Sequence, residues 1–82
     1  PIEIDVLALD DENALICECK YAERPFDEKQ LSDLFESGTC IDRKNKYYMI
    51  FSKSGVTSSV LEKVAGLNNF KIVGLLDLFE RP

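Results

Sequence analysis

The stretch EIDVLALDDENALICECK, residues 3–20, consists of two apolar runs joined by a cluster of acids and an asparagine. Side chains in residues 2–9 alternate with the period of two that is typical of a β-strand. The Asp-Asp-Glu-Asn segment at 10–13 has the composition of a turn, and residues 14–20 have the pattern of a returning strand. The stretch therefore predicts a β-hairpin with a loop of about four residues.

Charged side chains stand at unexpected positions in this hairpin. Asp5 precedes the turn and Glu18 follows it, at comparable distances from the loop. Antiparallel pairing with a shared face would bring these two carboxylates within a few ångströms of each other. Lys20 falls on the same face as Glu18, because residues two apart in a strand point the same way. Glu3 flanks this group and is read as the solvent-facing start of the strand.

Beyond the hairpin, a helix is predicted over about residues 27–37. Its apolar side chains recur at helical spacing, acids crowd its first turn, and Gly38 stands where a C-terminal cap is expected. Residues 42–46 are read as a polar loop. The aromatic and branched residues at 47–51 then predict a third strand.

A second helix is predicted from Thr57 or Ser58 to Ala65. Ser59 and Glu62 have the spacing of a capping box, and three apolar residues form the expected buried stripe, namely Val60, Leu61 and Val64. Residues 70–75 predict a fourth strand, and the remaining residues form a polar tail.

The predicted order is strand, strand, helix, strand, helix, strand. Strands on either side of each helix can pair in parallel through right-handed crossovers, whereas the hairpin pairs antiparallel. The sequence therefore predicts an α/β fold, a mixed β-sheet with flanking helices. With 82 residues the chain is expected to form a single domain. Because it starts at Pro1, directly in a strand pattern, we expect it to be a piece of a longer protein.

The composition narrows the class of protein. The chain is 45% hydrophobic and 30% charged, which is ordinary for a globular domain. No apolar run approaches the roughly 20 residues that cross a bilayer. Three cysteines without any histidine do not predict a four-ligand zinc site. They are interpreted as buried, reduced thiols of a cytoplasmic protein. A net charge of −5 disfavours nucleic-acid binding through Lys and Arg alone.

The hairpin acids suggest a metal-dependent chemistry. Two close carboxylates repel each other and favour a bound cation, and hard oxygen ligands suit Mg²⁺ or Mn²⁺. A lysine beside such a metal can orient or deprotonate a water and stabilise negative charge at phosphorus. The alternative is a solvated strand face with a Glu–Lys pair, which contributes at most about 1 kcal/mol.

The same residues resemble a known superfamily. Ile4-Asp5, twelve intervening residues and then Glu18-Cys19-Lys20 resemble the PD-(D/E)xK phosphodiesterases, which include restriction endonucleases and Holliday-junction resolvases. The resemblance implies that Asp5 and Glu18 bind magnesium and that Lys20 is the catalytic lysine. Ile4 replaces the proline of the motif, and the first core helix of the superfamily is missing from this chain.

A closer resemblance covers nearly the whole chain. The segments EIDVLAL at 3–9, ECKY at 18–21 and YYMIFSKSGVT at 47–57 are similar to the nuclease-like C-terminal domain of archaeal P-loop ATPases, a family of unknown function. This resemblance implies that Lys53 contacts a DNA backbone. Tyr21, which follows the motif lysine, is expected to help shape the pocket and is the second candidate nucleic-acid-binding residue. The chain itself contains no G-x-x-x-x-G-K-[ST] motif.

Two functions follow as hypotheses. The first is a magnesium-dependent nuclease domain that hydrolyses phosphodiester bonds in DNA, as the C-terminal module of an archaeal ATPase. The alternative is a non-catalytic binding or dimerisation domain that regulates an ATPase in the same or a partner chain. The free edge of a truncated sheet would favour a homodimer in that case.

Overall fold

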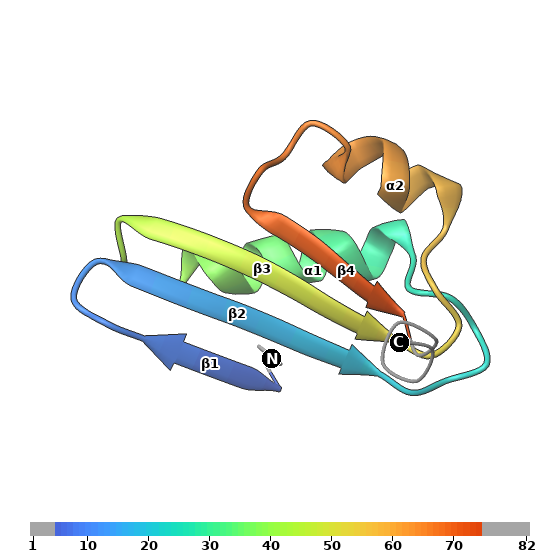
Figure 1. Ribbon diagram of the computed structural model, residues 1–82, viewed down its shortest axis with the longest axis horizontal. Coiled ribbons are helices and arrows are strands. Elements are labelled where there is room, and N and C mark those ends of the chain that lie inside the picture. Colours follow the sequence, from blue (N-terminus) through green and yellow to red (C-terminus); the bar gives the residue numbers. More distant parts are fainter. Residues whose placement is uncertain (1–4, 75–82) are drawn as a thin grey trace, which may run out of the picture.

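The computed structural model describes residues 5–74 and confirms the predicted order of elements (Figure 1). These elements are β1 (Val6–Leu9), β2 (Asn13–Lys20), α1 (Glu28–Thr39), β3 (Asn45–Ser52), α2 (Ser58–Val64) and β4 (Phe70–Gly74). Glu3, Ile4 and Leu75, which the sequence assigns to strands, lie outside the described residues.

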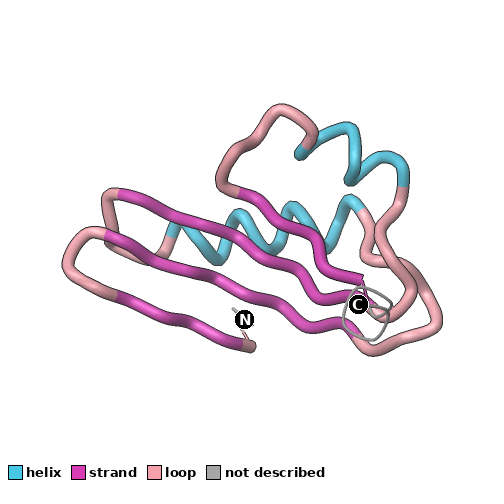
Figure 2. Tube along the Cα trace, in the orientation of Figure 1, coloured by secondary structure: helices cyan, strands magenta, loops and turns pink. Residues whose placement is uncertain are grey.

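The four strands form one sheet in the order β1-β2-β3-β4. β1 pairs antiparallel with β2, whereas β2–β3 and β3–β4 are parallel, as the crossover rule predicts. The loops gather at the two ends of the strands (Figure 2). The carboxyl ends of the parallel strands β2, β3 and β4 therefore lie together at one end of the sheet.

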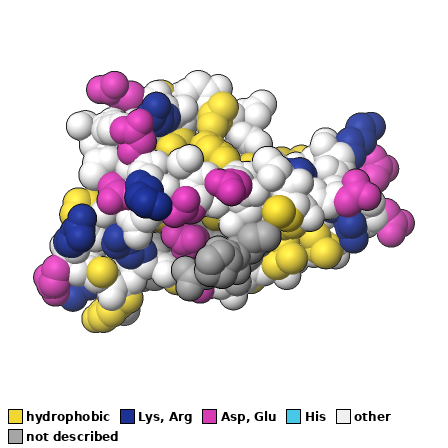
Figure 3. All heavy atoms as spheres, turned by 180° about the vertical axis from the view of Figure 1, so that it is seen from behind, with side chains coloured by type: hydrophobic (Ala, Val, Ile, Leu, Met, Phe, Trp, Pro, Cys, Tyr) yellow, Lys and Arg dark blue, Asp and Glu magenta, His cyan; other side chains and the backbone are white. Residues whose placement is uncertain are grey.

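Both helices pack on one face of the sheet and bury the part of it that β2 and β3 form. Their buried residues share one hydrophobic core with every second residue of β2 and β3. The core consists of Ala14, Ile16, Phe26, Leu31, Leu34, Tyr48, Ile50, Val60 and Val64. From behind, the outer surface shows acidic and basic side chains interspersed (Figure 3). The face of the sheet on which the helices pack is here called the helical face.

The opposite face, here called the open face, carries no helix in the described part of the chain (Figure 1). By strand alternation it presents apolar side chains from all four strands, including Val6, Leu15, Cys17, Met49, Phe51 and Val73. Cys17 is buried there, but Val6 is 50% exposed and Tyr47 is 45% exposed. No helix within residues 5–74 is long and apolar enough to cross a membrane.

The turn of the hairpin is one residue shorter than predicted, because Asn13 already belongs to β2. The carboxylate of Asp10 accepts hydrogen bonds from the backbone N–H groups of Glu12 and Asn13, at 3.0 and 2.8 Å. The amide of Asn13 also donates to it. These bonds hold the pKa of Asp10 below its usual value, the side-chain bond from Asn13 contributing most.

Helix α1 begins where predicted but ends two residues later. Asp27 is its N-cap, and Asp27 and Gln30 form a reciprocal capping box. The predicted C-terminal cap at Gly38 is wrong, since Gly38 lies inside α1 and Cys40 is the cap. Gly38 is required for another reason: a Cβ there would collide with the hydroxyl of Tyr48, which packs against the helix.

Three other local predictions are corrected. Asn45 and Lys46 belong to β3 rather than to a loop, because the backbone N–H of Asn45 donates to Glu12 and its side chain donates to Asn13. The predicted capping box of α2 is absent, since Thr57 is the N-cap and accepts from the backbone N–H of Val60. The stripe of α2 is narrower than expected, as Val60 and Val64 are buried but Leu61 is 52% exposed.

All three cysteines are free thiols. Cys17 is buried as predicted, but Cys19 and Cys40 are exposed, so the expectation of three buried thiols is wrong. Cys19 is the second-last residue of β2 and lies on the open face, which neither helix covers. Cys40 is the C-terminal cap of α1. Burial raises the pKa of the Cys17 thiol.

Candidate active site

A polar pocket of about 430 Å³, here called the acid pocket, lies beside the carboxyl end of β2. Its lining residues come from the hairpin and from α1: Asp5, Glu18, Cys19, Lys20, Gln30 and Asp33. The sequence predicts Asp5, Glu18 and Lys20 on one face of the hairpin, and the structure brings all three to the lining of one pocket. Of the described strands, β1 is exposed along its whole length, so this pocket opens where the helical cover of the sheet ends.

Asp5 directly precedes β1. Val6 pairs with Cys17 in the antiparallel register, and one further step of that register sets Asp5 opposite Glu18. The Oδ2 atom of Asp5 accepts a hydrogen bond from the backbone N–H of Cys19 at 2.6 Å. Asp5 thus closes the end of the hairpin and directs its carboxylate to the residue that separates Glu18 from Lys20.

Glu18 and Lys20 extend the helical face of β2 beyond its buried part. Ala14 and Ile16 are fully buried on this face, whereas Glu18 and Lys20 are only half-buried. Glu18 lies beside Ile50, and Lys20 lies beside Ser52 in the parallel register with β3. The alternation that buries the first half of β2 therefore carries two charged groups into the pocket in its second half.

The ammonium group of Lys20 is held by the first turn of α1. Its Nζ atom donates to Oε1 of Gln30 at 2.7 Å, and the same oxygen accepts from the backbone N–H of Asp27 at 3.0 Å. The Asp27 carboxylate in turn accepts from the backbone N–H of Gln30 at 2.9 Å. The capping box that starts α1 thus also positions Lys20 at the edge of the acid pocket.

Gln30 and Asp33 are pocket residues that the sequence analysis missed. They lie one turn apart on α1 and therefore point in similar directions, which is the only sequence signal for them. Asp33 forms an exposed ion pair with Lys29 at 3.5 Å. Its presence adds a third acid to the lining of the pocket.

The donor set suits a hard divalent cation. Carboxylate oxygens are the preferred ligands of Mg²⁺, and magnesium usually takes only one or two protein carboxylates and keeps several waters. Asp5 and Glu18 supply that number in a polar pocket. Within residues 5–74, however, no three or more His, Cys, Asp or Glu side chains form a group that could hold a metal ion.

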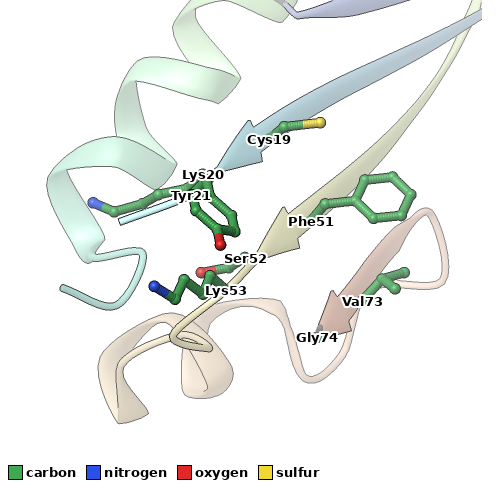
Figure 4. Close-up of a pocket in the computed structure, with 8 residues that line it drawn as sticks. All are labelled: Cys19, Lys20, Tyr21, Phe51, Ser52, Lys53, Val73 and Gly74. Carbon is green, nitrogen blue, oxygen red and sulfur yellow. The ribbon is translucent and has the colours of Figure 1, made fainter. Parts of the chain in front are cut away.

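Tyr21 and Lys53, the two predicted DNA contacts, belong to a second pocket of about 100 Å³. It is lined by Cys19, Lys20, Tyr21, Phe51, Ser52, Lys53, Val73 and Gly74 (Figure 4). Tyr21 is 79% exposed, and Nζ of Lys53 lies 4.7 Å from the centre of its ring. Tyr21 is thus found beside the acid pocket and not in its lining.

The turn that carries Lys53 is internally bonded. Gly55 adopts a φ of 77°, which other residues rarely adopt, and its carbonyl accepts from the Ser52 hydroxyl at 2.7 Å. The Ser54 hydroxyl donates to the carbonyl of Ala22 at 2.6 Å. Lys53 itself forms an ion pair with Glu23 at 3.0 Å. This geometry accounts for the Ser-Lys-Ser-Gly sequence as a strand-to-helix turn that presents one lysine.

Comparisons of the chain with protein-family models, with curated proteins and with solved structures find no match in any of the three. The resemblance to PD-(D/E)xK nucleases and to the ATPase-linked domain therefore stays a prediction.

Proposed function

We propose that this chain is a magnesium-dependent nuclease domain that hydrolyses phosphodiester bonds in DNA, as the C-terminal module of an archaeal, cytoplasmic ATPase. The observation that supports the proposal is the shared pocket of Asp5, Glu18 and Lys20. Two acids and one lysine from separate strand positions converge there, beside a helix end that orients the lysine.

In this proposal each residue has a distinct role. Asp5 and Glu18 hold the ion, which, when bound, supplies positive charge to stabilise the anionic transition state at phosphorus. Lys20 orients the attacking water and contributes charge at the same phosphate. Gln30 positions Lys20 without neutralising it, because its acceptor is an uncharged amide oxygen.

The test is cleavage of labelled duplex, single-stranded and branched DNA by the full-length protein with Mg²⁺ or Mn²⁺. Asp5→Asn and Lys20→Met are expected to lower the cleavage rate at least about a hundredfold. Asp11→Asn is the matched control, because Asp11 is exposed in the hairpin turn, outside the lining of the pocket. Full activity in Asp5→Asn or Lys20→Met would exclude the proposed roles.

A second candidate is the binding or dimerisation domain, which the open face favours. Apolar side chains from all four strands gather there, and Val6 and Tyr47 are about half exposed. Large exposed apolar surfaces often mark protein interfaces. Analytical ultracentrifugation over a wide concentration range tests this candidate. A monomer at every concentration, together with no ATPase partner in a co-purification, would remove it.

A further inference from the structure

The second pocket lies at the carboxyl ends of the three parallel strands β2, β3 and β4. Figure 4 shows Cys19, Phe51 and Val73 projecting to one side of the strands, and the ammonium groups of Lys20 and Lys53 directed to the other. We call this hollow the aromatic pocket. Ligands of α/β sheets commonly bind at this end of the strands.

The walls of the aromatic pocket are mostly apolar, and its lining includes Lys20 and Lys53, whose ammonium groups contact Gln30 and Glu23 on the other side of the strands. Tyr21 and Phe51 supply aromatic rings, and Val73 supplies an aliphatic wall. Lys53 lies over the Tyr21 ring, yet Tyr21 remains 79% exposed, so most of its surface is free to contact a ligand. A flat ring system attached to a negative charge would match these features, because base–aromatic stacking and phosphate–lysine contacts could form together.

The aromatic pocket adjoins the acid pocket. Cys19 and Lys20 line both, so the two hollows, which lie on opposite faces of the sheet, meet around the carboxyl end of β2. A chain of nucleotides whose scissile phosphate lies at Asp5 and Glu18 would therefore have a neighbouring nucleotide within reach of Tyr21. The two lysines would face its backbone.

From this arrangement we propose that the aromatic pocket binds one unpaired base of the DNA substrate, next to the phosphate that is cleaved. This inference rests on the proposed nuclease function. Bases in a duplex are stacked on their neighbours and must be extruded to enter a pocket, which costs free energy. The domain therefore selects single-stranded DNA, or an unpaired stretch in a branched DNA, over a continuous duplex.

The test measures binding apart from cleavage. Fluorescence anisotropy in EDTA, with a labelled oligothymidine of roughly 12 nucleotides and a duplex of equal length, gives the two affinities. We expect the single strand to bind more tightly than the duplex. Tyr21→Ala is expected to weaken single-strand binding about tenfold, because one stacking contact is lost.

Two variants serve as controls. Tyr21→Phe keeps the ring and is expected to bind like the wild type. Tyr47→Ala removes another half-exposed tyrosine of the open face, outside the lining of the aromatic pocket, and is expected to leave binding unchanged. Lys53→Met is expected to weaken binding and to reduce the salt dependence by about one released ion.

The outcomes separate the two proposals. No single-strand binding, equal affinity for the duplex, or unchanged binding by Tyr21→Ala would overturn the base pocket. Binding that depends on Tyr21, without any metal-dependent cleavage, would leave the pocket supported and defeat only the nuclease function. Cleavage that is lost in Asp5→Asn and Lys20→Met but unchanged in Tyr21→Ala would support the nuclease function and overturn the base pocket.

Discussion

The two faces of the sheet have similar apolar content but very different surroundings. On the helical face, Ile16 and Ile50 are fully buried under the helices. On the open face, Cys17 is buried by its neighbours, but Val6 remains half exposed. Near the carboxyl end of β2 the helical face carries the charged residues Glu18 and Lys20, which line a pocket together with Gln30 of α1. The comparison shows that the helical face stabilises the domain. The candidate site forms where the helices stop covering that face.

The largest expected effect comes from truncating neighbouring residues of β3 that point to opposite faces. Ile50→Ala is expected to lower the free energy of unfolding by about 3 kcal/mol, because it leaves a cavity in the core. Met49→Ala is expected to cost less than about 1.5 kcal/mol, since Met49 is only half-buried. Urea denaturation measures both. Equal losses would contradict the assignment of a single stabilising face.

Two glycines give the next comparison. Gly38→Ala is expected to destabilise the domain by about 2 kcal/mol, because the new Cβ would collide with the ring of Tyr48. Gly66→Ala meets nothing within 4 Å and is expected to be nearly neutral. Thermal unfolding of both variants measures the difference. A neutral Gly38→Ala would mean that Tyr48 does not pack against α1 as described.

A smaller effect is expected where the covered face meets the site. Gln30→Ala removes the acceptor of Lys20 and half of the capping box, and is expected to lower kcat about tenfold with little change in KM. Gln30→Glu preserves both acceptor roles and should retain the capping box. Cleavage kinetics of the full-length protein measure both variants.

Thr57→Ala controls for stability in that experiment. It removes the N-cap of α2, which is expected to cost about 1 kcal/mol without touching Lys20. An equal loss of kcat in Thr57→Ala and Gln30→Ala would assign the effect to helix stability. A slow-exchanging Lys20 ammonium signal in NMR spectra, lost only in Gln30→Ala, would assign it to lysine positioning.

The smallest expected effect is at the far end of the hairpin. Asn13→Ala should raise the pKa of Asp10 toward its ordinary value of 3.8, because the main bond that lowers it is lost. Since this pKa is lowered in the folded chain, the stabilisation is present above the unfolded value and is lost as pH falls through the folded pKa. A ¹³C titration of the carboxyl carbon measures the shift. An unchanged titration would show that Asn13 does not bond Asp10 in solution.

Strand alternation was enough to predict most of this architecture. The period of two in residues 14–20 set Ala14 and Ile16 inside and carried Glu18 and Lys20 to the same side. Turn chemistry between the two apolar runs fixed the hairpin, and so brought Asp5 near Glu18 across it. These features are local, and local patterns are visible in one sequence.

The predictions that were wrong or missing depend on contacts between distant parts of the chain. Gly38 resembles a helix cap in sequence, but its reason lies in Tyr48, which comes from another element. Leu61 fits the helical stripe, yet the short helix α2 buries only Val60 and Val64. Gln30 and Asp33 join the pocket because α1 crosses the sheet beside Lys20, and helix placement cannot be read from spacing alone.

Asp5 and Glu18 are proposed to form a divalent-metal site beside Lys20. The most direct measurement is a titration of the ¹⁵N-labelled domain with Mg²⁺, followed by backbone NMR, with Asp5→Asn as the control. We expect shifts that cluster at Asp5, Glu18, Cys19 and Lys20 and disappear in Asp5→Asn. The absence of such shifts at millimolar Mg²⁺, or equal shifts in the variant, would contradict the claim.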